Sequence, residues 1–303
     1  MIMSKVFGID LSSWQGGYNY SRATKEGVKF AILRAGFSQT KDSQFETHYK
    51  NAKKQGWGVG AYWYTYAESV AEAKAEAKAF LKVIKGKKFE YPIYLDIEDL
   101  SLRKLGKTTL NNIVKEFGTI IQNSGYYFGV YTNVDWYRNK INGSALNKKY
   151  DWWIACWDTS KPSGIDAGMW QFGGSYNAIR TNKVAGVTTD QDYAYKDYPT
   201  IMKQYGLNGY KKEIPTIGTY QTLAKMNIRT GPSTKYKKLY VKDLVKSDKA
   251  KVTKTKPDSY AMYKKGIKFK VTEIQKTNNE YWGKGPSGWT CIKNSRRTFC
   301  KKI

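Results

Sequence analysis

The chain has 303 residues and contains 52 Lys and Arg against 25 Asp and Glu, which gives a formal net charge of +27 at pH 7. This length is too great for one average domain, so we expect two folded units. No apolar run approaches 18 residues and no apolar leader precedes the first predicted strand, so we expect no membrane span and synthesis in the cytoplasm without a signal peptide.

The single histidine and the three cysteines limit the possible chemistry. His48 lies in a helical pattern without a matching Cys or His cluster, which argues against a metal site and against a histidine-based triad, and we expect it on a helix surface. Cys156, Cys291 and Cys300 give no even framework, so stability should not depend on disulfides. Only Cys291 and Cys300 are placed so that they could pair.

Apolar runs in the first half of the chain predict β-strands that alternate with helices. The strands are expected at residues 6–10, 28–36, 58–66, 91–98 and 126–132. The helices are expected at residues 21–26, 44–54, 69–84 and 109–123, with a short one at 134–140. Strands that alternate with helices indicate a parallel sheet with covered faces.

The pattern changes after residue 140. Three further strands are expected at 150–157, 168–172 and 187–195, with only loops between them. Eight strands and about five helices predict an α/β fold, an irregular TIM-like (β/α) barrel whose last third lacks helical cover. The reactive groups of such barrels lie at the carboxyl ends of the strands.

Four acidic residues fall at or near these predicted strand ends. Asp96 and Glu98 are two residues apart on one strand, so their side chains share a face with backbones about 7 Å apart. Asp10 and Asp192 end or follow other strands, and we expect all four around one mouth. Paired acids are typical of glycosidic bond cleavage, whereas an isolated Asp-x-Glu more often caps a helix or pairs with lysines.

Aromatic and amide side chains gather at the same ends. Flat aromatic faces suit the C–H faces of sugar rings, although about half of such residues are expected to be ordinary core. If Tyr62 and Tyr64 face the barrel axis, Trp63 faces the helices. The candidate substrate-binding residues are Trp14, Tyr62, Tyr64, Tyr131, Trp153 and Gln171.

Several short motifs carry a family resemblance. They are the opening Gly8-Ile9-Asp10-Leu11-Ser12-Ser13-Trp14-Gln15-Gly16, then Tyr94-Leu95-Asp96-Ile97-Glu98, Tyr131-Thr132-Asn133, Trp170-Gln171 and Asp190-Gln191-Asp192-Tyr193. Over roughly residues 4–205 the chain resembles glycoside hydrolase family 25, the lysozyme-type muramidases of phage endolysins and bacterial autolysins. The resemblance implies a barrel with five helices and three closing strands.

The resemblance also implies roles for the four acids. Glu98 matches the family's acid, Asp96 its partner, and Asp10 and Asp192 the supporting acids, without metal or cofactor. The chain departs from the family at Tyr62-Trp63-Tyr64, where many members have an aromatic-His-Phe run.

The mechanism requires a protonated Glu98 near neutral pH, and we expect burial and the charges of Asp96 and Asp10 to raise its pKa. Carboxyl groups about 5 to 5.5 Å apart suit a retaining enzyme and about 6.5 to 9.5 Å an inverting one, and the strand spacing leaves both open. We favour a third route, in which Asp96 orients the acetamido group of the substrate as the nucleophile, because the family's substrate is N-acetylated.

The rest of the chain differs in kind. We expect the barrel at residues 1–206, a linker at 207–213 and a small all-β barrel at 214–303, with strand-forming runs at 226–233, 266–274 and 281–292. The run Asn227-Ile228-Arg229-Thr230-Gly231-Pro232-Ser233 and the late Gly288-Trp289-Thr290-Cys291 resemble a bacterial SH3-type wall-binding domain. The lysine-rich stretch 241–256 is expected to protrude as a hairpin or loop. A purely structural appendage is the alternative.

Charge favours a polyanionic target for this second unit. Residues 211–303 contain 24 Lys or Arg and 6 Asp or Glu, a net charge of +18. Nucleic acid is a competing partner, but a mouth built of acids would repel phosphate. We therefore expect as partners the peptidoglycan and anionic wall polymers of a Gram-positive host, and neither nucleic acid nor a membrane.

These observations together predict a peptidoglycan hydrolase. The expected activity is that of an N-acetylmuramidase, which cleaves the β-1,4 bond between N-acetylmuramic acid and N-acetylglucosamine, in a phage endolysin that reaches the wall after holin-type release. The alternatives are an autolysin of the same activity, a non-catalytic wall-binding protein on a decayed barrel, and a chitin-directed glycosidase.

Overall fold

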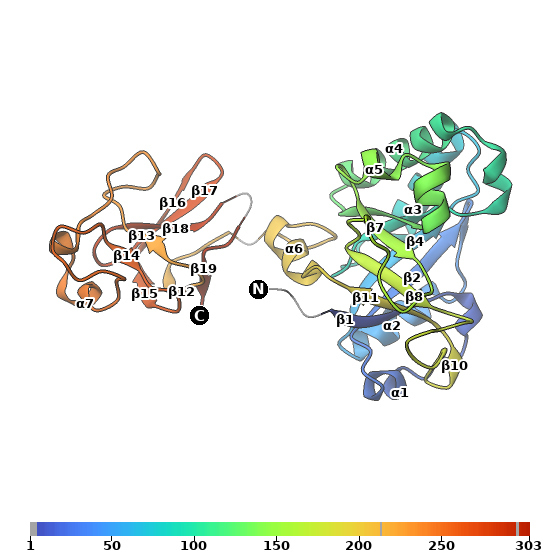
Figure 1. Cartoon of the computed structure of the whole chain (residues 1–303), viewed down its shortest axis with the longest axis horizontal. Coiled ribbons are helices and arrows are strands. Elements are labelled where there is room, and N and C mark those ends of the chain that lie inside the picture. The colour runs from blue at the N-terminus through green and yellow to red at the C-terminus, as the bar shows by residue number, and fades with distance from the viewer. Residues whose placement is uncertain (1–4, 213, 295–296) are drawn as a thin grey trace. The chain divides into compact units, whose positions relative to one another are not determined.

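The computed structural model describes residues 5–212, 214–294 and 297–303. The chain divides into two compact units, Met1–Glu213 and Ile214–Ile303 (Figure 1).

The first unit is a closed barrel of eight strands, as predicted. The strands are β1 (Val6–Leu11), β2 (Phe30–Phe37), β4 (Gly58–Tyr64), β5 (Ile93–Asp96), β6 (Phe128–Asn133), β7 (Asp151–Ala155), β8 (Met169–Gly173) and β11 (Asp190–Ala194). They pair in this order around the barrel, and β11 pairs back with β1 to close it. The short β3 (Thr40–Lys41) extends β2 as a hairpin.

The last strand corrects one expectation. β11 runs antiparallel to both of its neighbours, β1 and β8, whereas the other seven barrel strands are parallel. Its amino end therefore lies at the mouth where the other strands have their carboxyl ends. Asp190 begins this strand and faces Asp10 across the β1 pairing, so Asp190 reaches the mouth and Asp192 lies deeper. The predicted strand 187–195 is also split, because Val187–Thr188 form a separate hairpin, β9 (Lys183–Val184) with β10.

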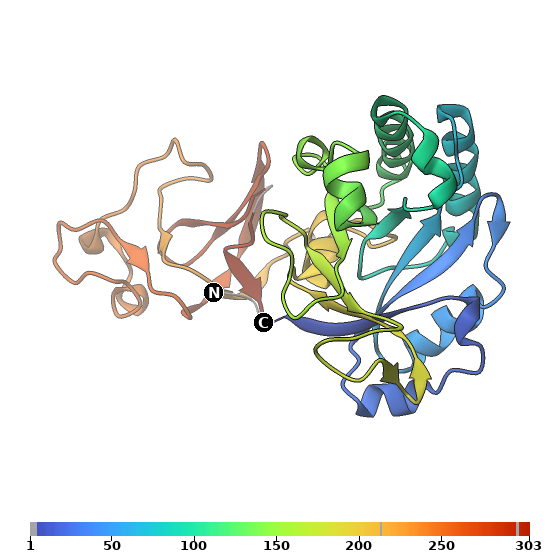
Figure 2. The same cartoon turned by 45° about the vertical axis from the view of Figure 1, so that its right-hand side comes forward.

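Helical segments follow each of the first strands and cover the outside of the barrel (Figure 2). They are α1 (Tyr20–Lys25), α2 (Phe45–Lys54), α3 (Val70–Ile84), α4 (Lys107–Asn123) and a π-helix η3 (Trp136–Lys140) that leads into α5 (Gly143–Leu146). Two 3-10 turns, η1 (Ser13–Gln15) and η2 (Leu100–Lys104), lie at the mouth. Ser69 caps α3 by accepting a hydrogen bond from the Glu72 amide at 3.2 Å, which explains where this helix begins.

Alternating side chains of β4 divide between two apolar layers. Trp63 lies between the strands and the helices, with its ring 5.2 Å from that of Phe80 on α3. Tyr62 lies inside the barrel, 5.9 Å from the ring of Trp153. The period of two therefore predicted correctly that Trp63 faces outward.

The predicted linker at 207–213 is in part a piece of the barrel. An additional helix, α6 (Tyr198–Tyr205), ends at Gly206, whose φ of 67° needs a residue without a side chain. Asn208 is fully buried, and the Tyr210 hydroxyl hydrogen-bonds to Glu90. Residues 207–210 are therefore fixed to the barrel, because Asn208 satisfies backbone groups that would otherwise be buried without partners.

We expect Asn208→Ala to lower the free energy of unfolding of the barrel by about 2 to 4 kcal/mol. The side chain donates to the Tyr91 carbonyl and accepts from the Tyr127 amide, both at 2.7 Å, and alanine leaves both groups unsatisfied. Denaturant unfolding measures the change, and Lys211→Ala on the exposed part of the segment is the control, with an expected effect within about 0.5 kcal/mol. Equal stability of the two variants would mean that the segment is a linker after all.

The second unit is a small all-β fold with its own core. Its strands are β12 (Gly218–Thr222), β13 (Met226–Asn227), β14 (Met262–Tyr263), β15 (Lys268–Val271), β16 (Glu273–Thr277), β17 (Glu280–Lys284), β18 (Trp289–Lys293) and β19 (Cys300–Lys302). They form small antiparallel sheets around a core that includes Trp282, Trp289, Tyr263 and Phe269. This agrees with the predicted small all-β unit.

The lysine-rich stretch of this unit does not protrude as a hairpin. It contains a 3-10 turn η4 (Val241–Asp243) and a short helix α7 (Lys246–Lys249). Asp248 is fully buried and accepts hydrogen bonds from the Tyr263 and Ser287 hydroxyls, both at 2.8 Å. This buried carboxylate also pairs with Lys251 at 3.2 Å and holds the stretch against the core, while the other lysines of the stretch are exposed.

The cysteines are free thiols. Cys291 and Cys300 are buried on neighbouring strands, and the Cys300 Sγ lies 3.7 Å from the Cys291 carbonyl oxygen. The pairing that the sequence allowed is therefore not formed. Within the described residues, no helix is long and apolar enough to cross a membrane.

Candidate active site

A cavity of about 190 Å³ opens at the barrel end where the parallel strands finish. Nine of the ten residues predicted for the site line it, and Asp192 is the exception. Four further residues, Ser12, Gln15, Arg34 and Asp190, also line it. The full lining is Asp10, Ser12, Trp14, Gln15, Arg34, Tyr62, Tyr64, Asp96, Glu98, Tyr131, Trp153, Gln171 and Asp190.

The segment that carries Asp96 and Glu98 is held from both sides. β5 ends at Asp96, so Glu98 lies on the following loop rather than on the strand. The Asp96 carbonyl accepts from the Thr65 amide at 3.0 Å, and the Ile97 carbonyl accepts from the Thr132 hydroxyl at 2.6 Å. These bonds fix the loop as firmly as a strand, which is why both acids still face one cavity.

Glu98 is a half-buried acid whose carboxyl lies at the cavity wall. Asn133 donates to its Oε2 at 3.4 Å. Burial raises the pKa of Glu98, and the charges of Asp190 and Asp99 raise it further. Asp10 is not among the groups that shift the pKa of Glu98, and Asp190 takes this part because the antiparallel β11 places it at the mouth. The expected repulsion between Asp96 and Glu98 is present, and it raises the pKa of Asp96.

Asp96 is more deeply placed. It is 4% exposed, and its Oδ1 has no hydrogen-bond partner among the described residues. Burial raises the pKa of Asp96 well above its ordinary value, repulsion from Glu98 adds to this, and the Arg34 guanidinium lowers it. An unpartnered buried carboxyl oxygen is costly, so it is suited to receive an N–H or O–H donor from a ligand.

Gln171 orders a chain of hydrogen bonds that ends at Asp10. The Tyr131 hydroxyl and the Trp157 Nε1 both donate to its Oε1 at 3.0 Å. Its Nε2 then donates to the Asp10 carboxylate at 2.9 Å. Because both halves of the amide are engaged, the orientation of Gln171 is fixed, and with it the position of the Asp10 oxygen that accepts from its Nε2.

The two acids of β11 have different surroundings. Asp192 is fully buried and accepts from the Trp153 Nε1 at 2.7 Å, so it supports the cavity floor instead of lining it. Asp190 lines the cavity, and burial raises its pKa to about 6. Burial followed by the charges of Asp190 and Asp192 raises the pKa of Asp10. Sequence reasoning missed Asp190 because it assumed that every strand ended at the mouth.

The aromatic residues form a floor and a rim. Trp153 is 1% exposed and packs 4.3 Å from the Tyr131 ring, so it is core and cavity floor together. The Tyr64 hydroxyl donates to Asp99 at 2.9 Å. Trp14 is 83% exposed on the η1 turn, and its indole is free to stack on a sugar ring. The structure brings all six predicted binding residues together, and their contacts with substrate stay predictions.

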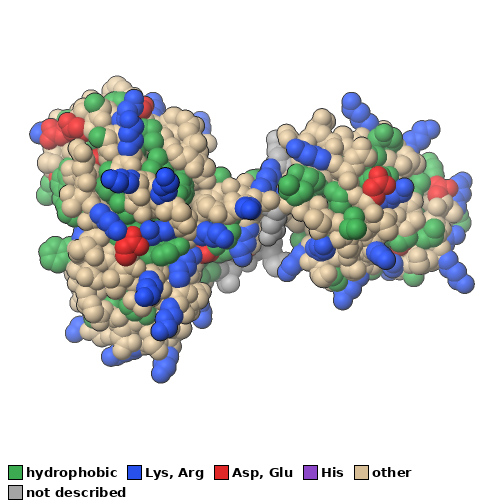
Figure 3. Space-filling model, turned by 180° about the vertical axis from the view of Figure 1, so that it is seen from behind, with side chains coloured by type: hydrophobic (Ala, Val, Ile, Leu, Met, Phe, Trp, Pro, Cys, Tyr) green, Lys and Arg blue, Asp and Glu red, His purple; other side chains and the backbone are tan. Residues whose placement is uncertain are grey.

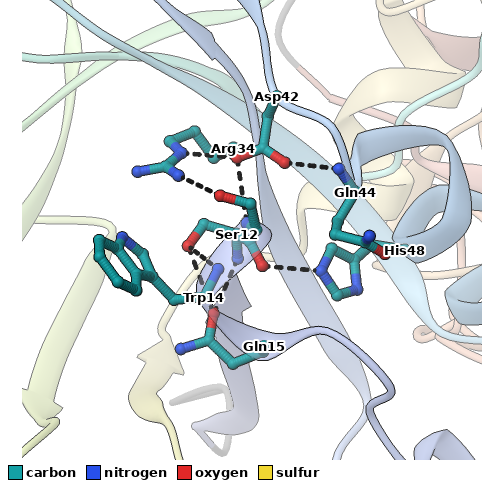
Figure 4. A network of polar contacts seen from close by, with 8 residues as sticks. Ser12, Trp14, Gln15, Arg34, Asp42, Gln44 and His48 are labelled. Carbon is teal, nitrogen blue, oxygen red and sulfur yellow. Dashed lines mark hydrogen bonds and ion pairs between the residues drawn. The ribbon is translucent and has the colours of Figure 1, made fainter.

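His48 was wrongly expected on a helix surface. It is buried, and its Nε2 lies 2.8 Å from the Ser12 carbonyl oxygen (Figure 4). Its Nδ1 lies 2.7 Å from the Tyr20 hydroxyl. Ser12 in turn accepts from the Trp14 amide and begins the η1 turn. His48 therefore anchors the turn that carries Trp14, and burial lowers its pKa.

No group of three or more His, Cys, Asp or Glu side chains within the described ranges has the arrangement of a metal site.

A (β/α) barrel whose mouth gathers carboxyl groups between aromatic faces defines the class of barrel glycosidases. Residues 9–179 match the family model described as glycosyl hydrolases family 25, and the chain belongs to this family.

Known relatives agree with this assignment. The chain is 30% identical over 178 residues to the autolytic lysozyme of Clostridium acetobutylicum, which covers 57% of this chain and 52% of that protein. It is 30% identical over 203 residues to lysozyme M1 of Streptomyces globisporus, covering 62% of this chain and 67% of the relative. The crystal structure of a bacterial lysozyme from Streptomyces coelicolor is similar, with a TM-score of 0.54 and 25% identity over 64% of this chain and 94% of that one. The chain spans about half the length of the first of these relatives.

We expect Asp190→Asn to lower the pKa of Glu98, because it removes a like charge that disfavours the Glu98 carboxylate. Carboxyl-carbon NMR titration measures the change, with the Glu98 signal assigned from Glu98→Gln. The exposed Asp158→Asn is the control and should leave the titration in place. A Glu98 titration that is the same in the Asp190→Asn and wild-type proteins would show that Asp190 does not act on this acid.

Proposed function

We propose that this protein is an N-acetylmuramidase that hydrolyses the β-1,4 bond between N-acetylmuramic acid and N-acetylglucosamine in peptidoglycan. The observation that carries the proposal is the pair formed by Glu98, a half-buried acid with a raised pKa, and Asp96, a buried acid with an unpartnered oxygen, in one cavity. Membership of family 25 supports the substrate class.

The proposed mechanism assigns each acid one task. Burial raises the pKa of Glu98 and so favours its protonated form, which donates the proton to the leaving glycosidic oxygen. The Asp96 carboxylate accepts the N–H of the substrate acetamido group on its free Oδ1, which orients the acetamido oxygen toward the sugar carbon and stabilises the positive charge that develops there. Asp10, held by Gln171, supports the same region from the opposite side.

The deciding experiment identifies the reducing end released from purified cell walls. A muramic acid end supports the proposal. A glucosamine end would indicate a chitin-type glycosidase, and the absence of cleavage by folded protein would indicate a non-catalytic wall-binding barrel.

We expect Glu98→Gln and Asp96→Asn each to reduce turnover by about a hundredfold or more while wall binding is retained. Glutamine cannot donate the proton, and asparagine cannot supply the negative charge. Rates on purified walls check this, with Asp158→Asn as an exposed control that should keep the wild-type rate. Near wild-type turnover of either site variant would remove that residue from its role.

The second unit is proposed to hold the enzyme on the wall as an SH3-type module. Lys and Arg side chains are spread over the face of this unit seen in Figure 3, where acidic side chains are few. Tyr240 and Tyr260 stack with ring centroids 4.8 Å apart, and Lys238 and Lys242 lie over these rings. Exposed aromatic faces beside lysines suit a sugar polymer that carries negative charge.

We expect residues 214–303, which have their own core, to bind walls of the target bacteria and to retain part of this binding when salt rises. Exposed charges are screened over about 8 Å at physiological salt, so attraction by charge alone should disappear while a shaped site persists. A wall pull-down across a salt series measures this, with Tyr240→Ala/Tyr260→Ala as the variant that should weaken salt-resistant binding. Equal binding to all walls that vanishes at moderate salt would indicate nonspecific attraction. The absence of binding at any salt would indicate that the second unit is a structural appendage.

Phage origin and holin-type release stay predictions. Lysis of host cells only after co-expression with a membrane-permeabilising protein would support them.

A further inference from the structure

Arg34 is the positive charge in an acidic cavity. Four carboxyl groups line the cavity, from Asp10, Asp96, Glu98 and Asp190, and Arg34 is the only Lys or Arg among the described residues that line it. It lies on β2, in a strand whose other residues are apolar or glycine. A single charged residue in such a strand needs a structural or chemical reason, because its burial is costly.

The guanidinium of Arg34 is fixed by two partners. Its Nε donates to Asp42 Oδ2 at 2.7 Å, and its Nη2 donates to the Ser13 hydroxyl at 2.8 Å (Figure 4). Asp42 is itself held, because it accepts from the Ser13 amide at 3.0 Å and from the Gln44 amide at 2.8 Å. The Asp42 side chain is fully buried and the Arg34 side chain is 15% exposed. A charge pair with this many hydrogen bonds holds one geometry.

One nitrogen of Arg34 is not used by this network. Among the described residues Nη1 has no hydrogen-bond partner, and Figure 4 shows it pointing away from Asp42. The charge of Arg34 acts on Asp96, whose pKa it lowers against the effects of burial and of Glu98. A purely structural Arg–Asp pair would not need to lie in the wall of the cavity.

Arg34 is the charged group beside Asp96 that favours its carboxylate form. Among the described residues, the other charged groups that line the cavity or shift the pKa of Asp96 are acidic. The tyrosines there are neutral because burial raises their pKa values. The charged and titratable groups of the surrounding elements are Asp10 on β1, Arg34 on β2, Tyr62 and Tyr64 on β4, Glu98 and Asp99 after β5, Tyr131 on β6, and Asp190 and Asp192 on β11.

We propose that Arg34 is a positioning residue of the muramidase reaction, whose guanidinium, held in place by Asp42 and Ser13, stabilises the Asp96 carboxylate that the reaction requires. The role of Arg34 in the reaction rests on the proposed function. Burial and the charge of Glu98 raise the pKa of Asp96, and Arg34 opposes this rise without being among the groups that shift the pKa of Glu98. The guanidinium therefore favours the carboxylate of Asp96 over that of Glu98.

The test compares two variants that differ only in the cavity charge. Asp42→Asn breaks the ion pair but keeps the guanidinium, and Arg34→Met/Asp42→Asn removes the guanidinium without leaving a buried unpaired carboxylate. Without the positive charge, Asp96 ionises at higher pH, so the acidic limb of kcat/KM should move to higher pH by about one unit relative to Asp42→Asn. Superimposable pH profiles, after scaling for rate, would overturn the proposal.

A conservative variant separates charge from shape. Arg34→Lys keeps a positive charge but loses the fork that binds Asp42 and Ser13 together. We expect its rate to fall while the acidic limb stays within about 0.3 units of the wild type, a small fraction of the shift that follows loss of the charge. An upward shift as large as that of the Arg34→Met/Asp42→Asn variant would show that geometry rather than charge is responsible, and would equally overturn the proposal.

A measurement without turnover distinguishes this inference from the proposed function. Carboxyl-carbon NMR titration follows Asp96 directly, with its signal assigned from Asp96→Asn, in the wild type and in each Arg34 variant. A higher Asp96 pKa on loss of the guanidinium supports the inference even if no muramic acid ends are released, in which case only the proposed function fails. An unchanged Asp96 pKa in an active enzyme overturns the inference and leaves the function standing.

Discussion

The repulsion among carboxyl groups that share one poorly hydrated barrel end is the constraint on which the site depends. Burial raises the pKa values of Asp10, Asp96, Glu98, Asp190 and Asp192, and the charges of neighbouring carboxylates raise those of Asp10, Asp96, Glu98 and Asp192 further. Such a cluster resists full ionisation, and small differences in surroundings decide which carboxyl groups hold the protons. Hydrogen-bond donors from Gln171 and Trp153, and the guanidinium of Arg34, provide these differences.

The barrel maintains this arrangement because its strands pair with one another all the way around the site. The antiparallel β11 closes the sheet and brings the Asp190 and Asp192 side chains against β1. A parallel strand at this place would have needed a further crossover helix. It would have placed Asp192 nearer the mouth and Asp190 deeper in the barrel. The direction of one strand therefore determines which acid reaches the cavity and which supports its floor.

Much of the barrel could be predicted from the sequence because local patterns decide it. The alternation of Tyr62 and Trp63 fixes which face each ring occupies, and Asp96 and Glu98 are near each other in any conformation of a short loop. Strand direction and tertiary burial have no such local signal. Asp192 was expected at the mouth because strand direction has no local signal. His48 was expected on a helix surface and residues 207–213 as a linker because burial has none, since hydrogen bonds to distant backbone groups hold His48 and Asn208. Arg34 did have a signal, as a charge within an apolar strand.

The buried thiols of the second unit have a consequence for where the protein can work. Burial raises the pKa of Cys291 and of Cys300 to about 12, so at neutral pH roughly one in a hundred thousand of these groups is the reactive thiolate. Oxidants and disulfide exchange act through the thiolate, and both reactions are correspondingly slow. This unit should therefore keep the same covalent structure in a reducing cell interior and in an oxidising medium, and would pass between the two compartments without a maturation step.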